Sequence, residues 1–307
     1  MIISASRRTD IPAFYSEWMI KRLKEEYVLV RNPMNFRQIS RVSLSPDVVD
    51  GIVFWTKNPL PLMNYLSELE KYSYYFQFTL TSYGTDMETN LPSKEKILIP
   101  AFQRLSESIG RERIVWRYDP IFFTEHYTME YHLTQFEKMA SQLGEYTEKC
   151  TISFLDFYRK ISGRIKALKI HIPNKKEKIE IVLQFAKIAE RYGFIVDACA
   201  EEGDYRLYGV NPGSCIDRER LERIIGCGLN VKKDPNQRQD CGCIASIDIG
   251  AYNTCDNGCV YCYANHSRFS IQKNRKLHRP DSPLLFGQIH PGDIIKEREM
   301  QCLKLLK

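Results

Sequence analysis

A chain of 307 residues with 43% hydrophobic and 27% charged residues has the composition of an ordinary folded protein, which excludes a low-complexity or disordered chain. Its formal net charge of +6 is mild, so it permits an anionic substrate or nucleic acid and requires neither. No apolar run approaches the roughly 18 residues that span a bilayer, and the N-terminus MIISASRRTD lacks the charge-first order of a secretory signal. We therefore expect a cytoplasmic protein with no membrane partner.

Seven short runs rich in β-branched, aromatic and other apolar residues alternate along the chain with amphipathic stretches. These predicted strands are IISAS from Ile2, GIVFWTKNP from Gly51, YYFQFTLTSYG from Tyr74, RIVWRYDP from Arg113, CTISFLDFY from Cys150, FIVDACAE from Phe194 and CIASIDIG from Cys243. Helices are predicted over 60–72, 94–109, 127–143 and 176–192, and after Asp10, which is suited to cap a helix with Pro12 in its first turn.

Strands that alternate with helices indicate an α/β fold with a parallel sheet. The spacing predicts a (β/α) barrel or partial barrel over 1–250, with a loop and tail over 251–307 packed as part of the same domain. An open doubly wound sheet is the alternative, although neither common Gly-rich phosphate loop is present. The predicted strand ends are rich in polar residues, and in a barrel these ends form the active site, so we expect a charged cavity there.

The stretch TCDNGCVYCYAN, from Thr254 to Asn265, places Cys255, Cys259 and Cys262 in a C-x3-C-x2-C pattern. In a reducing cytosol, clustered thiols are more often metal ligands than disulfides. A structural zinc site usually takes four Cys or His ligands, and a redox dithiol is a lone C-x-x-C. Three closely spaced cysteines best fit an iron–sulfur cluster in which the fourth iron stays open to another ligand.

Four more cysteines form a second candidate group. Cys199 ends a predicted strand, Cys215 lies in GSCID, and Cys241 and Cys243 form the C-x-C of DCGC. If these thiols converge at one end of a barrel, they indicate an auxiliary iron–sulfur cluster or a zinc site. The alternative is that they are buried as small hydrophobic residues.

The pattern C-x3-C-x-aromatic-C after the strand SIDIG resembles the cluster signature of radical S-adenosylmethionine enzymes. The resemblance implies a 4Fe-4S cluster on the three cysteines, with S-adenosylmethionine bound at the open iron. Electron transfer then cleaves this cofactor to a 5′-deoxyadenosyl radical that abstracts a hydrogen atom, and a reductant such as a ferredoxin or flavodoxin supplies the electron. Those enzymes carry the motif on the first barrel strand. Here it follows six strands, so we expect a circular permutation that places SIDIG next to IISAS.

The resemblance also implies roles for residues outside the cysteine motif. Tyr261 corresponds to the position that contacts the adenine. Arg7, Arg8 and Asp10 follow the strand whose end holds the methionine moiety, and arginine suits a carboxylate. The candidate contacts for ribose or substrate, chosen by their place at strand ends, are Lys57, Arg117 and Glu201. No catalytic residue is assigned.

The chain as a whole resembles an uncharacterised bacterial family, a domain of unknown function with a C-terminal cysteine-rich region. The resembling stretches are SASRRTDIPAF, VDGIVFWTKNP, WRYDPI and QRQDCGCIASIDIGAYNTC. The strand ends also resemble spore photoproduct lyase, a radical enzyme that repairs DNA, and the basic stretch 265–280 fits a phosphate backbone as well as a solvated surface. Two alternatives therefore remain open: a nucleic-acid repair or modification enzyme, and a non-catalytic iron–sulfur or zinc protein.

Overall fold

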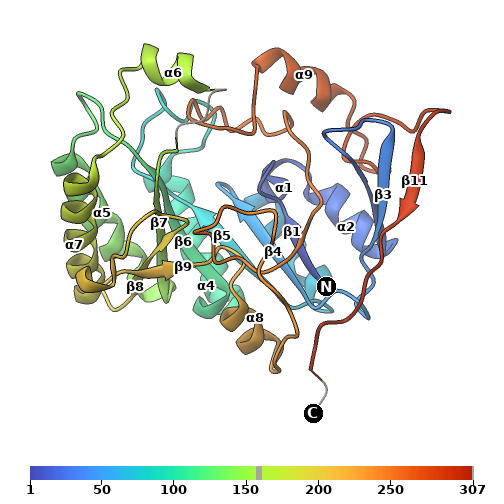
Figure 1. Cartoon of the computed structure of the whole chain (residues 1–307), viewed down its shortest axis with the longest axis horizontal. Coiled ribbons are helices and arrows are strands. Elements are labelled where there is room, and N and C mark those ends of the chain that lie inside the picture. The colour runs from blue at the N-terminus through green and yellow to red at the C-terminus, as the bar shows by residue number, and fades with distance from the viewer. Residues whose placement is uncertain (157–160, 306–307) are drawn as a thin grey trace.

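The computed structural model describes residues 1–156 and 161–305, so the last two residues of the run predicted from Cys150 lie outside the described residues. The main body is an eight-stranded sheet in the order β10-β1-β4-β5-β6-β7-β8-β9, in which all neighbouring strands are parallel (Figure 1). Its strands are β1 (Ile2–Ala5), β4 (Gly51–Thr56), β5 (Tyr74–Thr79), β6 (Ile114–Ile121), β7 (Lys149–Phe154), β8 (Ile195–Cys199), β9 (Asn211–Gly213) and β10 (Ile247–Asp248).

The predicted α/β class and parallel sheet are confirmed, and all seven predicted strands are present. Strand β10 lies beside β1, with Ile3 opposite Ile247 and Ser4 opposite Asp248, as expected for SIDIG and IISAS. Within the described ranges the edge strands β9 and β10 are not paired with each other, so the sheet is open and does not close into a full barrel. Strand β9 was not predicted, because it has only three residues and one of them is a proline.

Helices connect most of the strands, and the predicted helical stretches are confirmed except that 60–72 is α-helical only in its first turn. Asp10 caps the first helix, as predicted, by accepting a hydrogen bond from the amide of Ala13 at 3.0 Å. The helices are α1 (Ile11–Phe14), α2 (Ser16–Lys24), α3 (Leu60–Met63), α4 (Ile99–Ile109), α5 (Met129–Leu143), α6 (Ser162–Ala167), α7 (Lys175–Arg191), α8 (Arg218–Ile225) and α9 (Arg268–Lys276).

The two faces of the sheet are covered differently, because successive side chains of a strand point to opposite sides. On β6, Trp116 and Tyr118 face the large hydrophobic core, and the buried side chains of α1, α2, α4, α5 and α7 belong to that same core. Val115 lies in a smaller cluster on the other face, with residues of α8 and of the segment around Cys215. Helices α1, α2, α4, α5 and α7 therefore pack on one face, whereas α8, which lies between β9 and β10, packs on the other face with the segment around Cys215.

A second, three-stranded sheet joins the two ends of the chain. Strands β2 (Tyr27–Arg31) and β3 (Gln38–Ser43) form an antiparallel pair, and β11 (Ile294–Glu297) adds in parallel to β3. Close to it, the amino group of Met1 donates to the carbonyl oxygen of Gln301 at 2.9 Å. In the part of the chain that the structure describes, no helix has the length and apolar character needed to cross a membrane.

His132 on α5 is a buried titratable group in the large core. The Tyr118 hydroxyl donates to its Nδ1 at 2.8 Å, and its Nε2 donates to the carbonyl oxygen of Phe122 at 3.0 Å, an assignment that follows from the carbonyl being an acceptor only. Burial lowers the pKa of His132 from 6.5 to about 4.

This histidine predicts an acid-sensitive stability. In the unfolded chain this histidine binds a proton near pH 6.5, whereas in the folded chain it does so only near pH 4. The free energy of unfolding therefore falls by about 3 kcal/mol as the pH is lowered from 6.5 to 4. His132→Gln should remove this part of the slope, measured by urea unfolding at several pH values. His290→Gln, at an exposed position, should keep the wild-type slope. An unchanged slope in His132→Gln would contradict the prediction.

Candidate functional site

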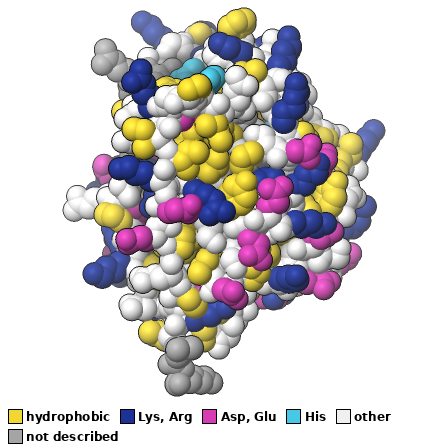
Figure 2. Space-filling model, turned by 90° about the vertical axis from the view of Figure 1, so that its right-hand side faces the viewer, with side chains coloured by type: hydrophobic (Ala, Val, Ile, Leu, Met, Phe, Trp, Pro, Cys, Tyr) yellow, Lys and Arg dark blue, Asp and Glu magenta, His cyan; other side chains and the backbone are white. Residues whose placement is uncertain are grey.

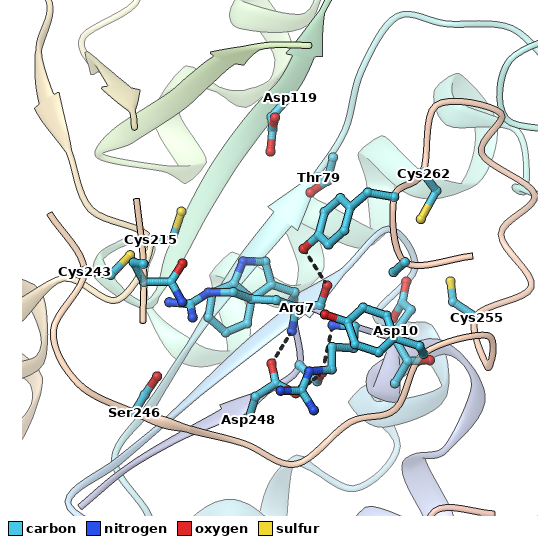
Figure 3. Close-up of a pocket in the computed structure, with 18 of the residues that line it drawn as sticks. Arg7, Asp10, Thr79, Asp119, Cys215, Cys243, Ser246, Asp248, Cys255 and Cys262 are labelled. Atoms are coloured by element: carbon cyan, nitrogen blue, oxygen red, sulfur yellow. Dashed lines mark hydrogen bonds and ion pairs between the residues drawn. The ribbon is translucent and has the colours of Figure 1, made fainter. Parts of the chain in front are cut away.

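A cavity of about 990 Å³ lies at the carboxyl ends of the parallel strands, where the polar strand ends predicted it (Figure 3). Both cysteine groups line it, as do most of the predicted cofactor contacts: Tyr261, Arg7, Arg8, Asp10, Lys57 and Arg117. Glu201 is not among the residues that line the described cavity. Its carboxylate accepts from the amide of Phe154 at 2.7 Å and from Lys178 Nζ at 2.8 Å, so it joins β7 to α7.

The loop that carries the first three cysteines follows β10 and is anchored on several sides. The Tyr15 hydroxyl donates to the carbonyl oxygen of Thr254 at 2.6 Å, and Arg164 Nη1 donates to that of Val260 at 3.0 Å. Gly258 has a φ of +73°, and a Cβ there would lie 3.1 Å from Cβ of Thr89. A side chain at this position would therefore be strained and crowded, which explains the glycine.

Asp10 connects this loop to two strand ends. Besides capping α1, its carboxylate accepts from Asn257 Nδ2 at 2.9 Å and from the amide of Lys57 at 2.8 Å. Because Asn257 belongs to the cysteine loop and Lys57 follows β4, the Asp10 carboxylate, which itself follows β1, holds the loop against the ends of both strands. Its predicted part in cofactor binding is then one of positioning the loop.

Cys255, Cys259 and Cys262 all line the cavity, and they are close enough that Cys259 and Cys262, when ionised, would raise the pKa of Cys255. Burial raises the pKa of Cys259 to about 12 and also raises that of Cys255 and Cys262. Thiols in such surroundings stay protonated and unreactive unless a cation displaces the protons, which speaks against a redox dithiol.

No three Cys, His, Asp or Glu side chains among the described residues are arranged around a point where one metal ion would sit. A cuboidal iron–sulfur cluster makes a different demand, because each thiolate binds a separate iron. Three soft thiol donors, spread along one loop beside a large cavity, fit that demand.

Tyr261 reaches into a buried charge cluster that the sequence did not predict. Its hydroxyl donates to the carboxylate of Glu88, which also accepts from Lys57 Nζ at 2.6 Å and pairs with Lys94. Burial alone would raise the pKa of Glu88, but the two ammonium groups outweigh it and lower the pKa to about 2. The Tyr261 ring packs against Tyr83, with centroids 5.8 Å apart, so it is held on both its polar and its apolar side.

Arg7 and Arg8, predicted to act together, point in different directions. The carboxylate of Asp248 on β10 accepts from the amide of Arg7 at 2.8 Å and fixes this turn. The Arg7 guanidinium lies 5.3 Å from the centroid of the Trp55 ring and faces Cys215 and Cys243 (Figure 3). The Arg8 guanidinium lies over Tyr252, beside the first cysteine loop. Arg8 is therefore the better placed of the two to meet a cofactor bound at that loop.

The second cysteine group converges at the other side of the cavity. Cys199 Sγ and Cys215 Sγ are 2.9 Å apart, and Cys243 is hydrogen-bonded to both Cys215 and Cys241. In Figure 3, Cys215 and Cys243 lie on the side opposite Cys255 and Cys262. The structure thus brings together four thiols from β8, the end of β9 and the segment before β10, as predicted from the sequence.

Comparison with known proteins gives a family and no activity. No curated protein matches this chain. The family described as a domain of unknown function, DUF1848, matches residues 2–264, a range that includes the sheet, the four converging thiols and the C-x3-C-x2-C loop. With a match over most of its length, the chain belongs to the DUF1848 family.

Proposed function

We propose that this chain is a radical S-adenosylmethionine enzyme in which Cys255, Cys259 and Cys262 hold a four-iron, four-sulfur cluster. The observation that carries the proposal is the position of the C-x3-C-x2-C loop, which follows β10 directly and opens on the charged cavity at the strand ends. When bound, the cluster and S-adenosylmethionine would supply a 5′-deoxyadenosyl radical for hydrogen abstraction from a substrate.

Two features of the fold support this proposal. Helices α1, α2, α4, α5 and α7, which lie between β1 and β8, cover one face of the sheet, as the helices of a (β/α) barrel do, whereas α8, between β9 and β10, packs on the other face. The sheet then corresponds to a partial barrel. Strand β10 also pairs with β1 although almost the whole chain separates them. That pairing is what a circular permutation would produce if it moved the cluster-bearing strand from the start of the chain to its end.

The residues of this chain would bind and orient the cofactor. Arg8, beside the loop, carries a guanidinium suited to a carboxylate. Tyr261 presents a ring held by Tyr83 and a hydroxyl held by Glu88, so its position is fixed before an adenine binds. Across the cavity, Asp119 accepts from Ser153 and pairs with Arg117, which makes this wall a candidate for polar substrate contacts.

The alternatives have less support in the residues present. In Figure 2, Lys and Arg are interspersed with Asp and Glu over most of the face that is drawn, and Arg275 of the basic helix α9 pairs with Asp256. Neither feature resembles a continuous phosphate-binding surface. For the non-catalytic alternative, Cys241 or Cys243 would have to supply a fourth ligand to the first loop, but both contact the second cysteine group instead.

The proposal is tested on anaerobically purified protein reconstituted with iron and sulfide. After reduction, S-adenosylmethionine is expected to change the electron paramagnetic resonance signal of the cluster and to yield 5′-deoxyadenosine. S-adenosylhomocysteine, which lacks the sulfonium centre, should yield none. A cluster signal that ignores S-adenosylmethionine, with no 5′-deoxyadenosine, would refute the proposal and favour a structural metal. Salt-sensitive binding of DNA or RNA would move the search for a substrate to nucleic acids.

A further inference from the structure

The second cysteine group is built to hold the sulfur atoms together. Cys199 ends β8 and Cys215 follows β9, so the pairing of these neighbouring strands brings the two cysteines into contact. Between Cys241 and Cys243, a Cβ at Gly242 would lie 2.4 Å from Ser214 Oγ, so the glycine allows the C-x-C segment to approach closely. The backbone amide of Ile216 also donates to Cys243 Sγ at 3.3 Å.

Buried positive charge surrounds these four thiols. Arg117, which is 5% exposed, donates from Nη1 to Cys215 Sγ at 2.9 Å. Arg7 faces Cys243 and Cys215, and its Nη2 is buried without a hydrogen-bond acceptor in the described part of the chain. Buried guanidinium groups need negative partners: Asp119 pairs with Arg117, and Asp248 acts on Arg7 but also pairs with Arg8, so Arg7 has no carboxylate of its own among the described residues. Neutral thiols do not supply that charge, but thiolates do.

We propose that Cys199, Cys215, Cys241 and Cys243 bind one thiolate-preferring divalent metal ion, zinc or iron, as a tetrahedral four-sulfur site. Binding M²⁺ displaces four thiol protons, so the product is a complex of charge −2 beside Arg7 and Arg117. This site is separate from the proposed radical centre and does not depend on it.

The distances favour a single ion over a cluster. With metal–sulfur bonds of about 2.3 Å, two thiolates on one tetrahedral ion lie about 3.8 Å apart. Cys199 Sγ and Cys215 Sγ are only 2.9 Å apart, so they would have to separate by about 1 Å to bind one ion. In the described residues the four thiols are therefore too close together to surround an ion without this movement. A cuboidal cluster requires a much larger expansion, because each thiolate binds a different iron.

The test uses the full chain with Cys255, Cys259 and Cys262 changed to serine, so that only the second group can bind. We expect one equivalent of Co²⁺ to bind, with the intense visible absorption of tetrahedral thiolate coordination. Adding Cys199→Ser or Cys243→Ser should weaken binding at least about 100-fold. Cys150→Ser, a buried thiol in the main core, should leave it unchanged. Competition between Zn²⁺ and Fe²⁺ then measures how strongly the site prefers one of these ions over the other.

A second measurement does not depend on whether the serine variants fold. In the otherwise unchanged chain, bound Zn²⁺ should protect these four thiols from alkylation, as mapped by peptide mass spectrometry. The proposal fails if no metal binds, if binding survives Cys199→Ser and Cys243→Ser, or if Cys199 and Cys215 are found joined as a disulfide. Because the first loop is disabled in the binding test, these results leave the radical proposal untouched.

Discussion

Cys259→Ser is expected to abolish the formation of 5′-deoxyadenosine from S-adenosylmethionine, a loss of at least about 100-fold. Cys259 lies in the middle of the C-x3-C-x2-C loop, directly after Gly258, and lines the cavity beside Lys57 and Tyr261. Serine keeps the size of the side chain but is a poor ligand for iron, so the cluster would lose one of three anchors. The measurements are iron content, the electron paramagnetic resonance signal and the amount of 5′-deoxyadenosine.

Cys150→Ala is the matched control, because Cys150 is fully buried but packs in the main core, away from the cavity. It should keep iron, signal and product near wild-type values. Cys255→Ser and Cys262→Ser should each be as damaging as Cys259→Ser, since the three ligands act as a unit and their effects are not additive. A Cys259→Ser protein that still produces 5′-deoxyadenosine would show that this loop does not hold the reactive cluster.

The sheet was largely predictable because its strands are buried on both faces and therefore appear as short, continuous apolar runs. Strand β10 has only two residues, yet its place beside β1 was expected, because the cysteine motif after it resembles one that radical S-adenosylmethionine enzymes carry on the first barrel strand. Strand β9 left no such signal, since Pro212 and Gly213 are both disfavoured in strands and its pairing depends on β8. Short strands of this kind form through their neighbours.

Site residues could be predicted where their type and spacing in the sequence are distinctive. They could not be predicted where distant segments of the chain meet only in the folded structure. Both cysteine groups could be identified from the sequence, because thiols are rare and their clustering is informative. Glu88 lies in the loop after β5 and Lys94 begins the helical segment that follows, places where charged residues are ordinary, so only the fold shows that they meet Tyr261. Glu201 illustrates the converse: it lies at a strand end, but Lys178 on α7 draws its carboxylate away from the cavity.

Glu88→Gln is expected to destabilise the folded protein by about 3–5 kcal/mol, because it leaves two largely buried ammonium groups without a counter-charge. Lys57 and Lys94 have side chains that are 12% and 18% exposed, and both pair with this carboxylate, which is itself 1% exposed. Glutamine keeps the shape and still accepts a hydrogen bond, so the loss would report on charge. Urea unfolding at neutral pH measures the free energy, and the slope of the transition shows whether the fold is otherwise retained.

The pH dependence gives an independent check on the same ion pairs. The pKa of Glu88 is lowered from 4.5 to about 2 in the folded chain, so its contribution to stability is complete above pH 4.5 and is lost as the pH falls towards 2. That window corresponds to about 3 kcal/mol, in the range expected for the substitution. Glu95→Gln is the matched control, since Glu95 pairs with Lys138 on the surface, where solvent screening leaves such a pair with little effect on stability. If Glu88→Gln costs no more than Glu95→Gln, Lys57 and Lys94 do not depend on this carboxylate, and the argument that Glu88 fixes the hydroxyl of Tyr261 beside the cavity fails with it.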